Sequence, residues 1–381
     1  MLRNLFGKNR TLITVAGATL CATSVVVGVG LGSAASAASG GLAAAQQLVA
    51  KYKTLPTFVA PGPAVKGKAL GKGKTVMIVP YDMEVPYNVV TVAGIKQANT
   101  RLGIKTDVYQ DQGEPSQWEA GVLQGITDKV SAIDLIGGLT PSSVEPQIKE
   151  AEKAGIAVVD STGNDPSVAS PSYVTTDVPL NYTLAGDLEA AYAITQTSGK
   201  ADVLIITSSD VTASEYVTGG ATKTMSSDCP SCTVHVIDVP VTEWGTELTP
   251  DVESALTADP GINYVLPNYD SEVPLVDAAL TANHSTTVGV DSLNGDPAPL
   301  AQIAAKNGLN MDIGQDMTYT GYATVDAELR AFGHAKSRVK TLNEHIPFVI
   351  FDSSNISTTG AHYAVGYGSV LNGYLKLWGL Q

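Results

Sequence analysis

Polar side chains stand directly after several short apolar runs of this sequence. Asp160 and Ser161, for example, follow the apolar residues 156–159. Residues in equivalent places are Tyr81, Asp82, Gly137, Gly138, Asp210, Asn268, Tyr269, Asp270, Asp291 and Gln315, and aromatic residues in the loops beyond such runs are Tyr87, Tyr216 and Trp244. Carboxylates accept hydroxyl protons and aromatic faces cover C–H surfaces, which suits neutral polyhydroxy compounds. The same residues would also suit a cationic ligand, through cation–π attraction. A purely structural role is the other alternative, because single Asp or Ser residues after a strand are often helix caps.

The apolar runs alternate with helical patterns, and this alternation must position the polar residues. Strand-like runs at 75–81, 104–110, 132–138 and 156–160 are separated by helical segments that end at glycines such as Gly103 and Gly155. The rhythm pauses at 171–181 and resumes, with strand-like runs at 201–207, 233–239, 262–268, 286–291 and 309–315. Repeated βα units predict parallel sheets covered by helices. We therefore expect an α/β fold with two doubly wound lobes, and a ligand at the carboxyl ends of their strands.

Composition narrows the possible partners. The chain has 381 residues, 44% of them hydrophobic, and a formal net charge of −14. This content supports a well-formed core. The acidic balance argues against nucleic acid or an anionic membrane surface as a partner, because both require a basic face.

The N-terminal segment has the pattern of a signal peptide. Basic residues Arg3, Lys8 and Arg10 precede a charge-free apolar run to about residue 32, and 35–37 read Ala-Ser-Ala, a site for a signal peptidase. The alternative is a membrane anchor, because the run is long enough to span a bilayer. We expect export with cleavage after residue 37, to the periplasm or the cell surface.

Cys229 and Cys232 stand in a Cys-Pro-Ser-Cys sequence before the strand-like run 233–239. In an exported protein this spacing favours a small structural disulfide. A redox-active pair would stand at a helix start, and a zinc site would need two more ligands of suitable spacing, which are absent nearby.

The order of these segments resembles a known family. Residues 85–103, 132–138, 150–161, 173–190, 262–280 and 287–295 together resemble the ribose-binding-protein group of type I periplasmic binding proteins, which are the solute receptors of ABC importers and relatives of the lac-repressor effector domain. The resemblance implies two lobes joined by three crossovers, with the ligand enclosed between them. The division we predict is a signal peptide at 1–37, a leader at 38–74, lobe one at 75–176 with 316–346, and lobe two at 177–315 with 347–381, which includes a C-terminal extension.

The resemblance also implies roles for particular residues. Tyr87 and Asn88 match lobe-one stacking positions, Trp244 the lobe-two stacking aromatic, and Gln315 a crossover amide. Polar ligand contacts are implied at Asp160, Ser161, Tyr269, Asp270 and Asp291, with Asp177 at the lobe junction and Tyr216 as a looser match.

The sequence has fewer basic residues than ribose binders in the part that should face the ligand. Between Asp177 and Gln315 it has no arginine and only three lysines, so nothing there would pair with a carboxylate or phosphate ligand. We expect a neutral sugar or polyol, with a cationic or other small polar compound as the alternative. The expected partner of this monomer is an ABC permease, and a membrane sensor is the alternative.

No constellation for catalysis is evident. The five histidines are scattered, and there is no Gly-x-Ser-x-Gly or His-Glu-x-x-His motif. Asp160 and Asp291 are a pair that a glycosidase would use, but in this fold they more plausibly hold hydroxyl groups. We expect no enzyme activity, no cofactor and no metal, and ligand capture by hinge closure.

Overall fold

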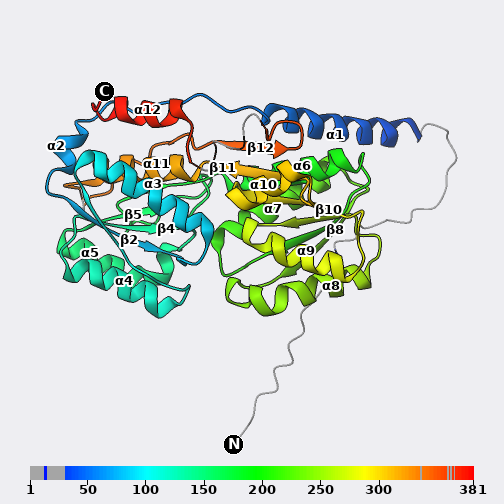
Figure 1. Cartoon of the computed structure of the whole chain (residues 1–381), viewed down its shortest axis with the longest axis horizontal. Coiled ribbons are helices and arrows are strands. Elements are labelled where there is room, and N and C mark those ends of the chain that lie inside the picture. The colour runs from blue at the N-terminus through cyan, green and yellow to red at the C-terminus, as the bar shows by residue number, and fades with distance from the viewer. Residues whose placement is uncertain (1–12, 15–30, 335–336, 358–359, 361–362, 364) are drawn as a thin grey trace, which may run out of the picture.

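Two α/β lobes lie side by side in the computed structural model, which describes residues 13–14, 31–334, 337–357, 360, 363 and 365–381 (Figure 1). The predicted fold class is thereby confirmed. The predicted signal peptide falls mostly outside the described residues. Among the described helices, none has the length and apolar character needed to cross a bilayer.

Lobe one is built on a five-stranded parallel sheet in the order β3-β2-β4-β5-β6. Its strands are β2 (Thr75–Pro80), β3 (Lys105–Val108), β4 (Ala132–Ile136), β5 (Ala157–Ser161) and β6 (Thr176–Val178). Its helices are α3 (Pro86–Leu102), α4 (Pro115–Thr127), α5 (Glu145–Ala154), the short η1 (Pro141–Val144) and α11 (Met317–Ala331). The predicted glycine stops are present, since Gly103 and Gly155 follow α3 and α5 in the left-handed conformation, at φ 78° and 80°.

Lobe two is built on a sheet in the order β1-β8-β7-β9-β10-β11-β12. Its central strands are parallel, and β1 and β12 are antiparallel edges. The strands are β1 (Ile13–Thr14), β7 (Asp202–Thr207), β8 (Thr233–Asp238), β9 (Tyr264–Pro267), β10 (Gly289–Asn294), β11 (Met311–Gln315) and β12 (Phe348–Asp352). The helices are α6 (Tyr182–Gln196), α7 (Thr212–Asp228), α8 (Thr249–Ala258), α9 (Val273–Ala282) and α10 (Pro297–Ala305), with short turns η2 (Val241–Glu243), η3 (Trp244–Leu248) and η4 (Asp270–Glu272). The predicted disulfide joins Cys229 to Cys232 between α7 and β8.

The chain crosses between the lobes at three places that the resemblance implied. It passes from β6 to α6, from β11 to α11, and along residues 332–347 to β12. The third connection runs beside β6, where the Val339 N–H donates to the Thr175 carbonyl at 2.8 Å. The polar strand ends of the two sheets therefore face each other across the interface.

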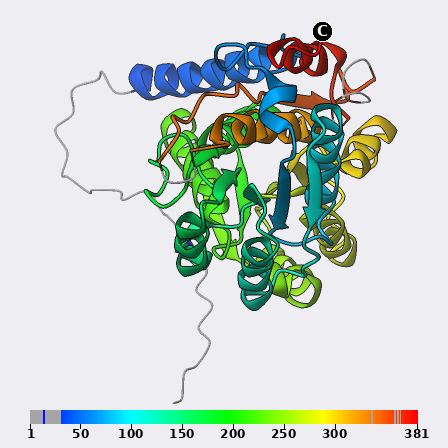
Figure 2. The same ribbon diagram turned by 90° about the vertical axis from the view of Figure 1, so that its left-hand side faces the viewer.

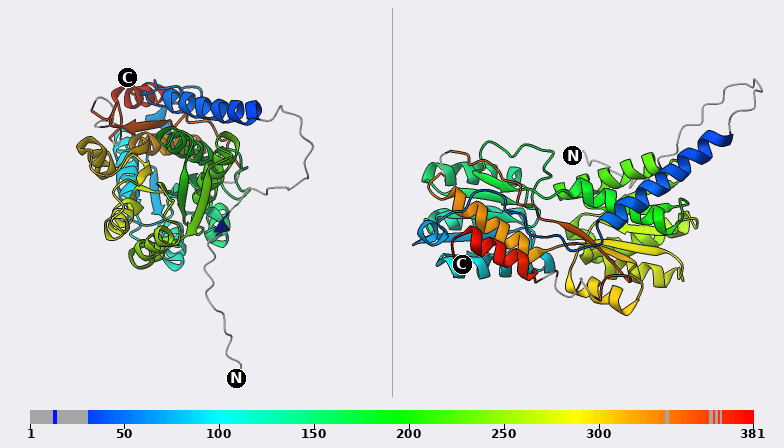
Figure 3. Two further views of the ribbon diagram at one scale, coloured as in Figure 1. Left: turned by 90° about the vertical axis from the view of Figure 1, so that its right-hand side faces the viewer. Right: turned by 90° about the horizontal axis from the view of Figure 1, so that it is seen from above.

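Both terminal segments also connect the lobes. Helix α1 (Leu31–Lys51) packs on α6 and α7 of lobe two, and the chain then reaches α2 (Gly67–Gly71) on lobe one. At the other end, α12 (Gly368–Leu377) lies on lobe one, against α11 (Figures 2 and 3). We had assigned residues 347–381 to lobe two; of the described elements in this range, β12 belongs to the lobe-two sheet and α12 packs on lobe one.

Aromatic packing explains where the C-terminal helix docks. The Trp378 ring stacks on Tyr322 of α11 with centroids 5.5 Å apart, and its Nε1 donates to Asp326 at 2.8 Å. The leader joins the same assembly, since the Gly67 N–H donates to the Trp378 carbonyl at 3.0 Å. The end of the leader and helix α12 thus pack together on lobe one.

Candidate functional site

A small cavity of about 50 Å³ lies between the lobes, at the carboxyl ends of their strands. Five aromatic residues contribute to its wall: Tyr81, Tyr87 and, from lobe two, Tyr182, Trp244 and Tyr269. Small or aliphatic residues complete the apolar part of the wall: Val85, Gly137, Gly138, Val211, Ala213 and Val241. The volume is well below the roughly 300 Å³ at which ligand pockets usually begin. The lobes are therefore seen in a tightly closed arrangement.

The Trp244 ring is fixed at its edge. Its Nε1 donates to Ser208 Oγ at 3.0 Å and to the Val239 carbonyl at 3.1 Å. The Tyr269 ring lies 6.0 Å from it, centroid to centroid, and the Tyr269 hydroxyl is hydrogen-bonded to Ser214 at 2.9 Å. Because the polar atoms of both rings are engaged within lobe two, the rings present apolar surface toward the cavity.

A hydrogen bond from Tyr81 joins the two lobes. Its hydroxyl donates to Asp210 Oδ2 at 3.1 Å, and its ring packs on Trp118 with centroids 4.9 Å apart. Burial, followed by the charge of Asp210, raises the pKa of Tyr81, so the phenol stays a donor. The hydroxyls of Thr140 and Thr212 form a second contact between lobes at 2.9 Å. A third crosses from the Tyr182 hydroxyl to the Thr162 carbonyl at 2.6 Å, and all three contribute to the closed arrangement.

Two amide side chains present unpaired acceptors in the cavity wall. Asn88 Nδ2 donates to the Asp82 carbonyl at 2.7 Å, and Gln315 Nε2 donates to Asn294 Oδ1 at 3.1 Å. The opposite oxygens, Asn88 Oδ1 and Gln315 Oε1, are buried and have no hydrogen-bond partner in the protein. Such acceptors are costly to bury unless a donor reaches them, and a hydroxyl group inside the cavity would supply such a donor.

Glycine at position 137 makes room for one of these acceptors. Gly137 follows β4 at φ 73°, and a Cβ there would lie 1.9 Å from Asn88 Oδ1. A side chain at this position would therefore displace the Asn88 amide from the cavity wall.

The cavity wall carries no charge. Among the residues that the structure describes, no Asp, Glu, Lys, Arg or His lines it, and its polar members are Asn88, Ser271, Asn294 and Gln315, besides tyrosine hydroxyls. An ionic ligand would lack a counter-ion here. Aromatic faces with neutral acceptors are suited to a small uncharged molecule with hydroxyl groups.

A wider groove of about 790 Å³ adjoins the cavity and shares Val85, Val241, Trp244 and Ser271 with it. Its wall is mainly proline and valine, with Asp82, Glu84, Asp270 and Asp296 among its acidic members. The acidic character predicted for the cleft is thus found outside the inner cavity.

Of the twelve predicted ligand-binding residues, the structure brings six together around the cavity. These are Tyr81, Tyr87, Asn88, Trp244, Tyr269 and Gln315. The other six, Asp160, Ser161, Asp177, Tyr216, Asp270 and Asp291, do not line it. Three polar or aromatic residues of the wall that we had not predicted are Tyr182, Ser271 and Asn294.

The three predicted residues of lobe one that do not line the cavity form hydrogen bonds within the protein. Asp160 is buried and accepts a hydrogen bond from Asn164 Nδ2 at 2.5 Å, while Ser161 Oγ is bonded to Thr324 of α11 at 2.7 Å. Burial, followed by the nearby Asp177 charge, raises the pKa of Asp160 to about 8. Asp177 accepts a hydrogen bond from the Thr341 hydroxyl in the third connection. These residues therefore stabilise the hinge side of lobe one.

The carboxylates of lobe two also lie away from the cavity. Asp291 is fully buried and accepts a hydrogen bond from the Tyr264 hydroxyl at 2.5 Å. We had ended this strand at residue 291, but β10 continues to Asn294, so Asn294 reaches the cavity instead. Asp270 accepts from Ser292 Oγ at 2.5 Å and faces only the outer groove. Tyr216 lies on α7 and does not line the cavity. Burial, followed by the charge of Asp165 in lobe one, raises the pKa of its hydroxyl.

The comparisons with known proteins agree with this architecture. A family model described as periplasmic binding protein domain matches residues 76–333. The chain belongs to this family. No curated protein sequence matches it. The members of this family are solute-binding proteins and not enzymes. The predicted family and the prediction that the protein is not an enzyme are therefore confirmed.

Solved structures show the same fold at low identity. A solute-binding protein of an ABC transporter from Bacillus halodurans, solved with myo-inositol, has a TM-score of 0.66 at 17% identity, covering 76% of this chain and 98% of its own. One from Mycobacterium smegmatis, solved with glycerol, has a TM-score of 0.65 at 18% identity, with 74% and 96% covered. One from Actinobacillus succinogenes, solved with D-allose, has a TM-score of 0.63 at 20% identity, with 74% and 99% covered.

Proposed function

We propose that this protein is an exported receptor of an ABC importer, and that it binds a small neutral sugar or polyol between its lobes. The observation that carries this proposal is the uncharged aromatic cavity with two unpaired buried amide oxygens, Asn88 Oδ1 and Gln315 Oε1. Ligand hydroxyls would donate to these oxygens, and the rings would cover the C–H faces of the ligand. The similar solved structures that carry myo-inositol, glycerol and D-allose support this ligand class.

The mechanism we propose is hinge closure. Opening breaks the Tyr81–Asp210 and Thr140–Thr212 contacts and widens the cavity for entry. A ligand then bridges Asn88 of lobe one and the rings of lobe two, and the closed form is the one that a membrane permease recognises. A ligand shifts this equilibrium only by its differential affinity for the closed form.

The inner cavity favours a neutral ligand over a cation. A cation would gain from the five rings by cation–π attraction, but no acidic residue lines the cavity, and those that line the adjoining space belong to the outer groove. A cationic ligand would therefore have to extend from the cavity into that groove, toward Asp82 and Asp296.

A thermal-shift panel of sugars, polyols, amines and amino acids tests the proposal on the protein as recovered after export. A ligand specific to the folded state raises the melting temperature. We expect a shift with a sugar or polyol that is smaller in Trp244→Ala at the same ligand concentration. A shift confined to amines would replace the neutral ligand with a cation, and no shift with any compound would contradict the ligand class.

A further inference from the structure

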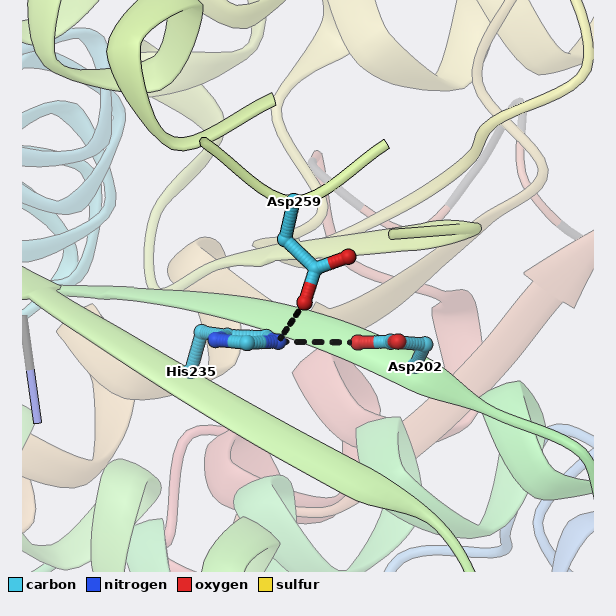
Figure 4. A group of neighbouring side chains, drawn as sticks. All are labelled: Asp202, His235 and Asp259. Atoms are coloured by element: carbon cyan, nitrogen blue, oxygen red, sulfur yellow. Dashed lines mark hydrogen bonds and ion pairs between the residues drawn. The ribbon is translucent and has the colours of Figure 1, made fainter. Parts of the chain in front are cut away.

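Three side chains that the cavity does not use come together at the opposite end of the lobe-two sheet. Asp202 is the first residue of β7, His235 lies in β8, and Asp259 follows α8 (Figure 4). Because the ligand cavity lies at the carboxyl ends of the strands, this cluster is a separate place on the lobe. We name it the Asp-His-Asp cluster.

The spacing of the three side chains matches that of metal ligands. His235 Nε2 lies 3.0 Å from Asp202 Oδ1 and 3.3 Å from Asp259 Oδ2, and one ligand atom from each residue lies within 4.8 Å of the others. Zinc binds imidazole nitrogen and carboxylate oxygen at about 2.0–2.2 Å, so neighbouring ligands of a tetrahedral ion are about 3.3 Å apart. The cluster therefore needs little rearrangement to surround one ion.

Burial and hydrogen bonds hold parts of the cluster in place. His235 is 2% exposed, and Figure 4 shows its Nε2 directed between the two carboxylates. Asp259 Oδ1 accepts the Gly261 N–H at 2.9 Å, which leaves Oδ2 toward the imidazole. Asn263 Oδ1 accepts the Asp202 N–H at 3.0 Å. Hydrogen bonds that orient the ligand side chains are typical of metal sites. Asp259 has such a bond, and His235 is oriented by packing, because its Nδ1 is buried without a partner in the protein.

The charge and access of the cluster also suit a cation. Nε2 carries at most one proton, so it donates fully to only one of the two carboxylates that it faces. With a neutral imidazole the cluster has a charge of −2. The carboxylate side chains are 22% and 38% exposed, which gives an ion a path from solvent and leaves space for a water ligand.

We propose that Asp202, His235 and Asp259 form a site for a divalent first-row transition metal, with Zn²⁺ as its representative. The imidazole nitrogen favours such ions over Ca²⁺ and Mg²⁺, which take oxygen ligands. The bound ion ties the start of β7 to β8 and to the turn before β9, and so stabilises the outer end of lobe two.

The test is Zn²⁺ titration of chelator-treated protein that carries no polyhistidine tag. Calorimetry is expected to give one Zn²⁺ per chain at this site, with a rise in melting temperature of about 2–4 °C or more. Asp259→Asn, at a partly exposed position, is expected to weaken the binding at least about 10-fold. The matched control His284→Ala removes an exposed histidine of the same lobe and is expected to leave the binding unchanged.

The absorption spectrum of bound Co²⁺ provides a second readout. We expect the strong visible bands of four-coordinate Co²⁺ in the wild type and in His284→Ala, and their loss in Asp259→Asn and His235→Gln. If His235→Gln fails to fold, Asp259→Asn decides the question alone. Equal Zn²⁺ binding by the wild type and Asp259→Asn, or no Zn²⁺ binding at all, would mean that the cluster is only a hydrogen-bonded ion pair.

Discussion

Removing the Tyr81 hydroxyl is expected to open the protein. Tyr81→Phe keeps the ring packed on Trp118, 4.9 Å away, and deletes only the hydrogen bond that crosses to Asp210. Asp210 keeps its bonds from the Val241 N–H within lobe two, so the substitution does not leave the carboxylate without a partner. The change therefore isolates one contact of the closed form.

The magnitude follows from the environment of that contact. A hydrogen bond contributes about 0.5–1.5 kcal/mol net, and more when the acceptor is charged. Tyr81 is 5% exposed, but Asp210 remains exposed to solvent, which screens its charge. We therefore expect the closed form to lose about 1 kcal/mol relative to the open form, which is about a fivefold fall in the closed-to-open ratio.

Single-molecule energy transfer between the lobes measures this ratio directly. Dyes at the exposed positions Glu119 on α4 and Thr281 on α9 report on the separation of the lobes. Tyr269→Phe is the matched control, because it also deletes a tyrosine hydroxyl, but one that bonds to Ser214 in the same lobe.

We expect Tyr81→Phe to increase the low-transfer population about fivefold and Tyr269→Phe to leave it unchanged. Equal populations in the wild type and Tyr81→Phe would refute the role of this bond in closure. A similar increase in both variants would mean that hydroxyl loss acts through lobe two and not through the lobe interface.

Three further outcomes follow from the structure. Trp244→Ala should weaken binding of the ligand found in the panel by about 1–3 kcal/mol in calorimetry, because an aromatic wall of the cavity is lost; unchanged affinity would remove Trp244 from the site. Trp378→Ala should lower the free energy of unfolding by about 3–5 kcal/mol in urea, because the buried ring stacks on Tyr322; a neutral result would show that α12 is dispensable to lobe one. Burial raises the Asp160 pKa from 3.8 to about 8, so its contribution to stability is complete below pH 4 and declines as the pH rises toward 8; in denaturation series, Asp160→Asn should reduce this loss, and parallel pH profiles would contradict the assignment.

The two-lobe architecture could be predicted because its signals are local. Strand-like runs of a few apolar residues alternate with helical patterns, and glycines such as Gly103 and Gly155 end the helices at left-handed positions that other residues rarely adopt. The docking of α12 could not be predicted in the same way. It depends on the contact of Trp378 with Tyr322, 56 positions earlier, and on which face of α11 the rest of the fold leaves available.

The aromatic residues of the cavity wall were predicted better than its polar residues, because the last residue of a strand is hard to identify from the sequence. Trp244 and Tyr269 reach the cavity from the short turns η3 and η4, and Tyr87 reaches it from the first turn of α3, where the sequence had placed a loop. Asp291 does not, because β10 runs three residues further and successive side chains of a strand point to opposite faces. Extending the run 286–291 through Ser292 and Leu293 would have identified Asn294 as the polar residue at its end.

The charge of the cavity is the part of the site that composition could not indicate. A net charge of −14 predicts the sign of the surface potential and excludes anionic macromolecules. It does not predict the environment of an enclosed ligand, because the acidic side chains are used elsewhere: Asp160 and Asp291 in the lobe cores, Asp210 in the contact between lobes, and Asp202 with Asp259 around His235. What remains around the cavity is neutral, so under the proposed function hydrogen-bond acceptors and ring surfaces would select the ligand, and its affinity should depend little on ionic strength.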